Sequence, residues 1–196
     1  MTRKVFYSFH FKRDAWRAAQ VRNSNAIARE DEFGVIDSVE WQEIERQGDE
    51  AIKRWINDQL MNTSVTVVLI GAETAERDWV DYEIRQSWKR GNALLGVRIH
   101  GVKNHDTETD VPGASPFAKI RLGNGTPLSA IIKVYDWVKD NGRANLGTWV
   151  ENAFQARKAY AGESDLAKEA ADSVYARAKP VVAPSIITNP AKPWAR

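Results

Sequence analysis

The sequence contains no cysteine among its 196 residues. This absence excludes disulfides, thiolate zinc sites, iron–sulfur clusters and cysteine nucleophiles. No apolar run approaches the roughly 20 residues of a membrane-spanning helix, and the first residues lead into a strand-like segment rather than a signal peptide. A strong charge of one sign is also missing, because 28 basic and 26 acidic residues give a formal net charge of +2. We therefore expect a cytoplasmic protein that binds neither membranes nor nucleic acid.

The common cofactor and metal motifs are missing too. The chain has no G-x-G-x-x-G, no G-x-x-x-x-G-K and no H-E-x-x-H. Its three histidines are irregularly spaced, which predicts no metal site. We expect structural or surface roles for His100 and His105. His10 differs because it follows the first predicted strand, at the edge where open α/β sheets bind ligands.

Short apolar segments alternate with amphipathic ones along most of the chain. β-branched and aromatic runs predict strands at residues 4–9, 64–70, 94–99 and 131–137. Apolar residues at helical spacing predict helices at residues 13–22, 48–60, 79–90 and 146–160. Asp78 is expected to cap the third of these helices and Gly91 to end it. Residues 23–40, with a weak strand near 33–36, and residues 101–128 are predicted as long loops. The alternation predicts a doubly wound α/β sheet.

The composition changes after residue 161. Residues 1–161 hold the predicted α/β domain, and residues 162–196 are predicted to form a helix followed by an extended, proline-containing tail. Leu166, Ala170 and Val174 share one side of that helix. This apolar side predicts docking onto the domain or contact with a second copy in a homo-oligomer.

The helix after the central strand carries an aromatic ring one turn from a carboxylate. Trp79 and Glu83 are four residues apart and therefore lie on one side of the helix. Val80, Ile84 and Trp88 form the adjoining apolar stripe, so Glu83 is expected at its border and partly buried. Most helix glutamates are solvated, but this one is predicted near the ligand-binding edge of the sheet.

Six segments follow one another in the order of a known family: 4–14, Val21-Arg22-Asn23-Ser24, 48–60, 63–71, Trp79-Val80-x-x-Glu83 and Gly91-Asn92-x-Leu94-Leu95-Gly96. Over residues 3–103 this order resembles the TIR-like family that includes ThsB of the Thoeris anti-phage system. The resemblance implies a flavodoxin-like, three-layer fold with a parallel sheet of about five strands. It also implies an enzyme that cleaves NAD at the nicotinamide glycosidic bond and makes a cyclic or otherwise modified ADP-ribose signal. That product would activate a partner effector, and NAD would be the substrate, with no cofactor.

In catalytic members of this family a glutamate follows a tryptophan by four residues, and Glu83 has that position. Ordinary glycosidases use two carboxyl groups, but nicotinamide leaves NAD as a neutral molecule and needs no general acid. One carboxylate that stabilises the developing oxocarbenium charge is then sufficient, and aromatic rings would hold the substrate and exclude water. With Glu83 as the catalytic candidate, the candidates for substrate binding are Phe6, Ser8, Phe9, His10, Arg22, Asn23, Asp37 and Trp79.

Two other interpretations remain open. Many TIR domains are non-catalytic scaffolds that bind proteins or nucleotides. A scaffold would place Glu83 on a convex surface, paired with a cation such as Arg85 or Arg90, whereas an enzyme would place it in a cleft among aromatic rings. A receiver domain is disfavoured, because Phe9-His10-Phe11 replaces the acidic cluster that a receiver needs after its first strand.

Overall fold

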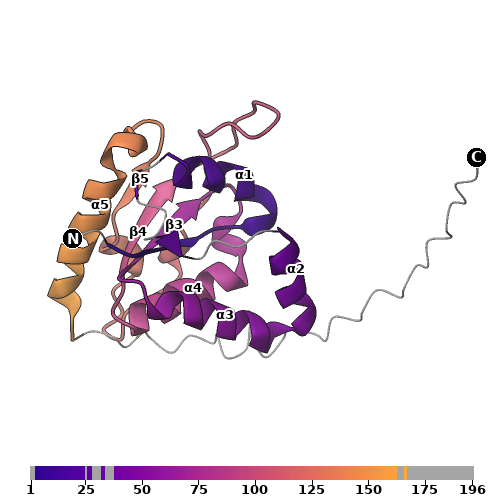
Figure 1. Ribbon diagram of the computed structural model, residues 1–196. Coiled ribbons are helices and arrows are strands. Elements are labelled where there is room, and N and C mark those ends of the chain that lie inside the picture. The colour runs from indigo at the N-terminus through magenta and orange to yellow at the C-terminus, as the bar shows by residue number, and fades with distance from the viewer. Residues whose placement is uncertain (1–2, 25, 28–31, 34–37, 163–165, 167–196) are drawn as a thin grey trace, which may run out of the picture.

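The computed structural model describes residues 3–24, 26–27, 32–33, 38–162 and 166. At its centre is a five-stranded parallel sheet with the strand order β2-β1-β3-β4-β5 (Figure 1). The strands are β1 (Val5–Ser8), β2 (Glu32–Phe33), β3 (Val65–Ile70), β4 (Ala93–Arg98) and β5 (Val134–Asp136). This arrangement confirms the predicted α/β fold and its parallel sheet.

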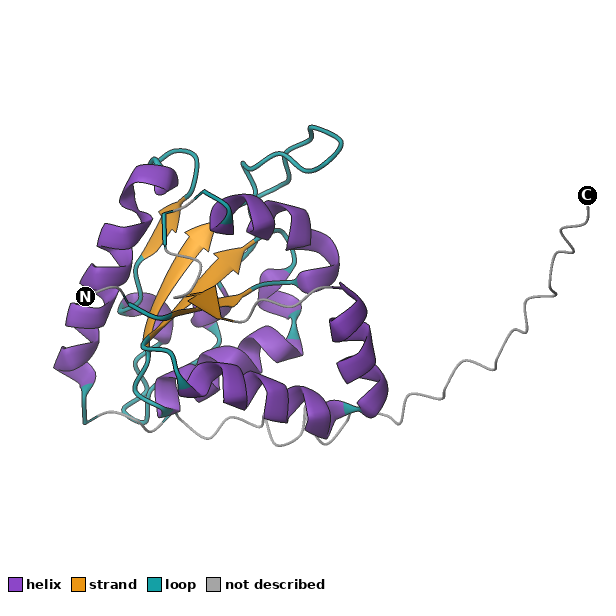
Figure 2. Ribbon diagram, viewed as in Figure 1, coloured by secondary structure: helices purple, strands orange, loops and turns teal. Residues whose placement is uncertain are grey.

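Helices cover both faces of the sheet (Figure 2). On one face, α1 (Phe11–Arg22) and α5 (Gly142–Arg157) pack against the central strands. On the other face lie α2 (Ser38–Gln47), α3 (Asp49–Met61) and α4 (Asp78–Lys89). The central strand β3 is buried along its whole length because side chains on both faces are covered. Its nearly continuous run of β-branched residues is the pattern expected of such a strand.

Neighbouring residues of β3 supply different cores because side chains alternate along a strand. Val67 and Leu69 belong to the core beneath α1 and α5. Val68 and Ile70 pack beneath α4. The same alternation in β1 turns Ser8 toward the face covered by α3 and α4, and this orientation determines what Ser8 can contact.

The ends of α4 differ in how well they match the predicted ends. Gly91 has a φ of 85°, its N–H donates to the Trp88 carbonyl at 3.0 Å, and the Asn92 N–H donates to the Ser87 carbonyl at 2.9 Å. These two bonds form a Schellman motif, so Gly91 ends the helix as predicted. The prediction of Asp78 as the N-cap was wrong. Arg77 occupies the N-cap position and makes no side-chain capping hydrogen bond, and Asp78 is the first helical residue. There its carboxylate complements the helix dipole.

The predicted loops are partly confirmed. Residues 101–128 form turns and short 3-10 segments, and the Asp110 carboxylate ties this excursion to Arg13 on α1 at 3.0 Å. The prediction of a loop up to residue 40 was wrong at its end, because α2 begins at Ser38. This helix forms where Trp41 and Ile44, three residues apart, pack onto the core beside α3.

The predicted extension at residues 162–196 lies outside the described residues, except for Gly162 and Leu166. Leu166 forms an isolated antiparallel bridge with Leu122 and packs on the core beneath α4. None of the helices in the described part of the chain combines the length and apolar character that a bilayer crossing requires.

Candidate functional site

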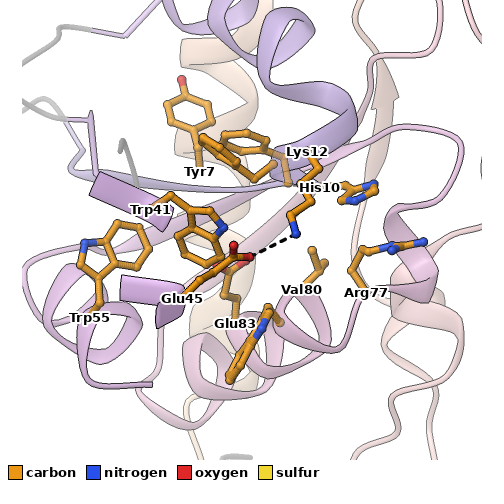
Figure 3. Close-up of a pocket in the computed structure, with 12 residues that line it drawn as sticks. Tyr7, His10, Lys12, Trp41, Glu45, Trp55, Arg77, Val80 and Glu83 are labelled. Carbon is orange, nitrogen blue, oxygen red and sulfur yellow. Dashed lines mark ion pairs between the residues drawn. The ribbon is translucent and has the colours of Figure 1, made fainter. Parts of the chain in front are cut away.

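A cavity opens at the carboxyl end of β1, among α1, α2, α3 and the beginning of α4 (Figure 3). Open α/β sheets bind ligands at this edge. The lining is mostly aromatic, with charged groups added, and consists of Tyr7, Phe9, His10, Phe11, Lys12, Trp41, Glu45, Trp55, Arg77, Trp79, Val80 and Glu83.

Glu83 is the buried acid of this cavity. Its residue is 7% exposed, and its Oε2 accepts a hydrogen bond of 2.5 Å from the hydroxyl of Ser8, which is 0% exposed. The bond forms because Ser8 points from β1 toward the helix layer in which the second turn of α4 places Glu83. Burial raises the pKa of Glu83 to about 8, and the Ser8 hydrogen bond acts in the opposite direction. At pH 7 the Glu83 carboxyl is therefore mostly protonated.

The second carboxyl oxygen of Glu83 is open to the cavity. Oε1 has no hydrogen bond to any described residue, and it is not among the fully enclosed polar atoms. No cation pairs with Glu83 within the described residues. Arg85 donates to Asp81 at 2.6 Å, and Arg90 donates to Asn57 at 3.5 Å. Glu83 thus lies in a cleft, and the paired, convex position expected of a scaffold is not what the structure has.

A row of aromatic rings forms one wall of the cavity. Ring centroids are 6.1 Å apart for Phe9 and Phe11, 5.8 Å for Phe11 and Trp41, and 5.9 Å for Trp41 and Trp55. Of this row, only Phe9 was predicted from the sequence as a substrate-binding residue. The other rings come from α1, α2 and α3, and the one available signal was the high number of tryptophans, eight in the chain.

Trp79 is the aromatic residue from α4, one turn before Glu83. It is half-buried and meets Tyr82 edge to face, with the ring centroids 6.0 Å apart. Aromatic faces on two sides of a buried acid suit a ligand that has flat rings.

Charged side chains surround the aromatic part of the cavity. Lys12 Nζ lies 3.6 Å from Glu45 Oε1 and joins α1 to α2 across it (Figure 3). Arg77 and His10 both face Glu73, at 3.1 Å and 3.8 Å. Burial, followed by the charge of Arg77, lowers the pKa of His10, which keeps its imidazole neutral at pH 7. Within the described residues no group of three or more His, Cys, Asp or Glu side chains is placed to hold a metal ion.

The structure brings some predicted site residues together and leaves others apart. Phe9, His10, Trp79 and Glu83 line the cavity, and Ser8 bonds to Glu83 beneath it. Among the other described candidates, Phe6, Arg22 and Asn23 do not line it.

Each of these exceptions has its own reason. Phe6 is completely buried in the core beside Trp41. Arg22 and Asn23 stand at the far end of α1, whose 12 residues carry them about 18 Å from the cavity at a rise of about 1.5 Å per residue. Asp37 lies outside the described residues.

Comparison with known proteins connects this cavity to a family. Residues 6–104 match the family model described as "Thoeris protein ThsB, TIR-like domain". The chain is also 31% identical to a protein of Bacillus cereus (strain MSX-D12) named "Putative cyclic ADP-D-ribose synthase ThsB1", in an alignment that covers 76% of this chain and 100% of the relative. The family match includes every residue that lines the cavity. The chain belongs to the ThsB family of Thoeris proteins and carries its TIR-like domain.

Proposed function

We propose that this protein cleaves NAD at the nicotinamide glycosidic bond and converts the rest of the molecule into a cyclic or otherwise modified ADP-ribose. The observation that carries the proposal is the position of Glu83, a buried acid with one oxygen held by Ser8 and the other facing an aromatic cavity. The name of the Bacillus cereus relative, a cyclic ADP-D-ribose synthase, agrees with this chemistry.

The charge of NAD explains how a glutamic acid that is neutral at pH 7 becomes a catalyst. The nicotinamide ring of NAD is a cation, and an opposite charge within a few ångströms favours the ionised form of a carboxyl group. Substrate binding therefore lowers the pKa of Glu83, and the Glu83 proton passes to the solvent as NAD enters, which leaves a carboxylate. As the glycosidic bond breaks, positive charge moves from the ring to the ribose, and the carboxylate stabilises it there. Nicotinamide leaves as a neutral molecule, so the step needs no proton donor.

The aromatic wall affects which group attacks the ribose. Rings such as Phe9 and Trp41 hold flat parts of the substrate and exclude water from the reacting carbon. Fewer water molecules favour attack by a group of the ADP-ribose itself, which closes a ring. Lys12 and Arg77 supply positive charge near the cavity for the diphosphate. The modified ADP-ribose would then act as a signal for a separate effector protein.

The test is to incubate the purified protein with NAD, follow nicotinamide release by chromatography and weigh the second product by mass spectrometry. Cyclisation gives a product lighter than ADP-ribose by one water, whereas hydrolysis gives ADP-ribose itself. Appearance of nicotinamide with either product supports NAD cleavage, and the mass separates the two outcomes. If nicotinamide does not appear at high protein concentration, nor after addition of lysate from phage-infected cells, the proposal fails.

A further inference from the structure

Two buried hydrogen-bonded pairs join the sheet to α4. Thr66 and Ser87 are 2.7 Å apart, and Ser8 and Glu83 are 2.5 Å apart. Thr66, Ser87 and Ser8 are all 0% exposed. Only the second pair contains a residue of the cavity lining, which is Glu83. The first pair therefore provides an internal comparison for the second.

Ser8 has no surface that a substrate can reach. Its side chain is fully enclosed, it is not part of the cavity lining, and its hydroxyl already contacts Glu83. The earlier expectation that Ser8 binds substrate therefore does not fit its position. A hydroxyl can donate to a carboxylate or accept from a carboxylic acid, so Ser8 satisfies Oε2 in both protonation states of Glu83.

No other side chain of the cavity lining holds the Glu83 carboxyl. The other lining residues that can carry a charge next to Glu83 are His10 after β1, Lys12 on α1, Glu45 on α2 and Arg77 before α4. Within the described residues none of them bonds to Glu83. Lys12 pairs with Glu45 at 3.6 Å and Arg77 with Glu73 at 3.1 Å, while the neutral His10 ring lies 3.8 Å from Glu73. The Ser8 hydroxyl is thus the one described group that fixes the orientation of the Glu83 carboxyl.

We propose that Ser8 is the positioning residue of this site: its hydroxyl holds Oε2 of Glu83, and Oε1 consequently faces the substrate. The inference rests on the proposed NAD cleavage and assigns Ser8 a role that requires no contact with NAD. A hydrogen bond to a charged acceptor is stronger than one to a neutral acceptor. Ser8 therefore also favours the carboxylate over the acid, against the effect of burial.

The experiment compares Ser8→Ala with the matched variant Ser87→Ala, measuring kcat and KM for NAD between pH 6 and pH 10. Loss of the Ser8 hydroxyl should move the acid limb of the kcat/KM profile upward by about one pH unit. It should also lower kcat about tenfold near neutral pH while KM changes less than about twofold. Ser87→Ala should keep the wild-type limb. An unchanged limb in Ser8→Ala, or a raised KM with normal kcat, overturns the inference. Ser8→Cys, which fills the site with a somewhat larger thiol that is a weak donor, should repeat the shift and serves as a second variant if Ser8→Ala does not fold.

A measurement without NAD separates this inference from the proposed function. The pH dependence of unfolding is compared for wild type, Ser8→Ala, Glu83→Gln and the double variant. Ser8→Ala should alter that dependence only when Glu83 is present. If this coupling is found and the wild type does not cleave NAD, the proposed function fails while Ser8 still holds Glu83. If NAD is cleaved and the coupling is absent, the inference about Ser8 is the part that fails.

Discussion

Replacing Glu83 by glutamine should make the protein more stable, and the gain should grow with pH. The folded protein holds the pKa of Glu83 at about 8, compared with its ordinary 4.5. At pH values between these two pKa values, the unfolded chain has released the Glu83 proton and the folded protein has kept it. The wild-type free energy of unfolding therefore falls by about 1.4 kcal/mol per pH unit relative to the neutral variant.

The total effect follows from the width of this interval. The two pKa values are about 3.5 pH units apart, which corresponds to at most about 5 kcal/mol near pH 8. Below pH 4.5 both side chains are neutral, so the two proteins should have similar stabilities there. Asp14, whose pKa burial raises to about 6, titrates in both proteins and cancels in the difference.

The assay is urea unfolding of wild type and Glu83→Gln, followed by tryptophan fluorescence at several pH values from 4.5 to 9. Glu50→Gln, at an exposed glutamate that pairs with Lys53 at 2.7 Å, is the matched control. Its difference from the wild type should stay small, as for other exposed ion pairs, and should not grow from pH 6 to pH 9. A stability difference between Glu83→Gln and wild type that does not change with pH would refute the reasoning, because it would mean that Glu83 ionises in the folded protein as easily as in water.

Four further substitutions test the fold and the cavity. Gly91→Ala, at a φ of 85°, should lower the free energy of unfolding by about 1 kcal/mol or more. Gly147→Ala inside α5, where a Cβ has room, should raise it by about 0.5–1 kcal/mol. Equal effects of the two substitutions in thermal unfolding would contradict the assigned helix end. Gly71→Ala would place its Cβ 2.2 Å from the Asp14 carboxylate and should lower stability by about 1–3 kcal/mol, so an unchanged midpoint of unfolding would show that this contact relaxes. Trp79→Ala should raise the KM for NAD about tenfold, measured by initial rates of nicotinamide release, and an unchanged KM would remove Trp79 from the substrate site.

Local sequence patterns were sufficient for the centre of the fold. The run Val65–Ile70 is β-branched or leucine at every position and buried on both faces, the pattern typical of a covered parallel strand. Gly91 marked the end of α4 because a positive φ has a strong residue preference. Trp79 and Glu83 were placed correctly relative to each other because helical spacing is fixed by geometry.

Other features depend on contacts between distant segments. The helix α2 has 10 residues, fewer than an isolated helix needs, and it is stabilised where Trp41 packs against rings from α1 and α3. Phe6 was expected to be one of the aromatic rings that hold the substrate, but α3 covers the strand at that depth. Arg22 could have been excluded from the sequence alone, since a helix that begins at the cavity carries its last residue away from it.

The most direct test of the account is the rate of nicotinamide release from NAD by wild type and Glu83→Gln at pH 8, with Glu50→Gln as the control. Wild type and the control should release nicotinamide and form a cyclic or otherwise modified ADP-ribose. In Glu83→Gln the rate of nicotinamide release should fall by at least about 100-fold, because the carboxylate that stabilises the transition state is gone. Equal release by wild type and Glu83→Gln would contradict the assignment of Glu83 as the catalytic residue.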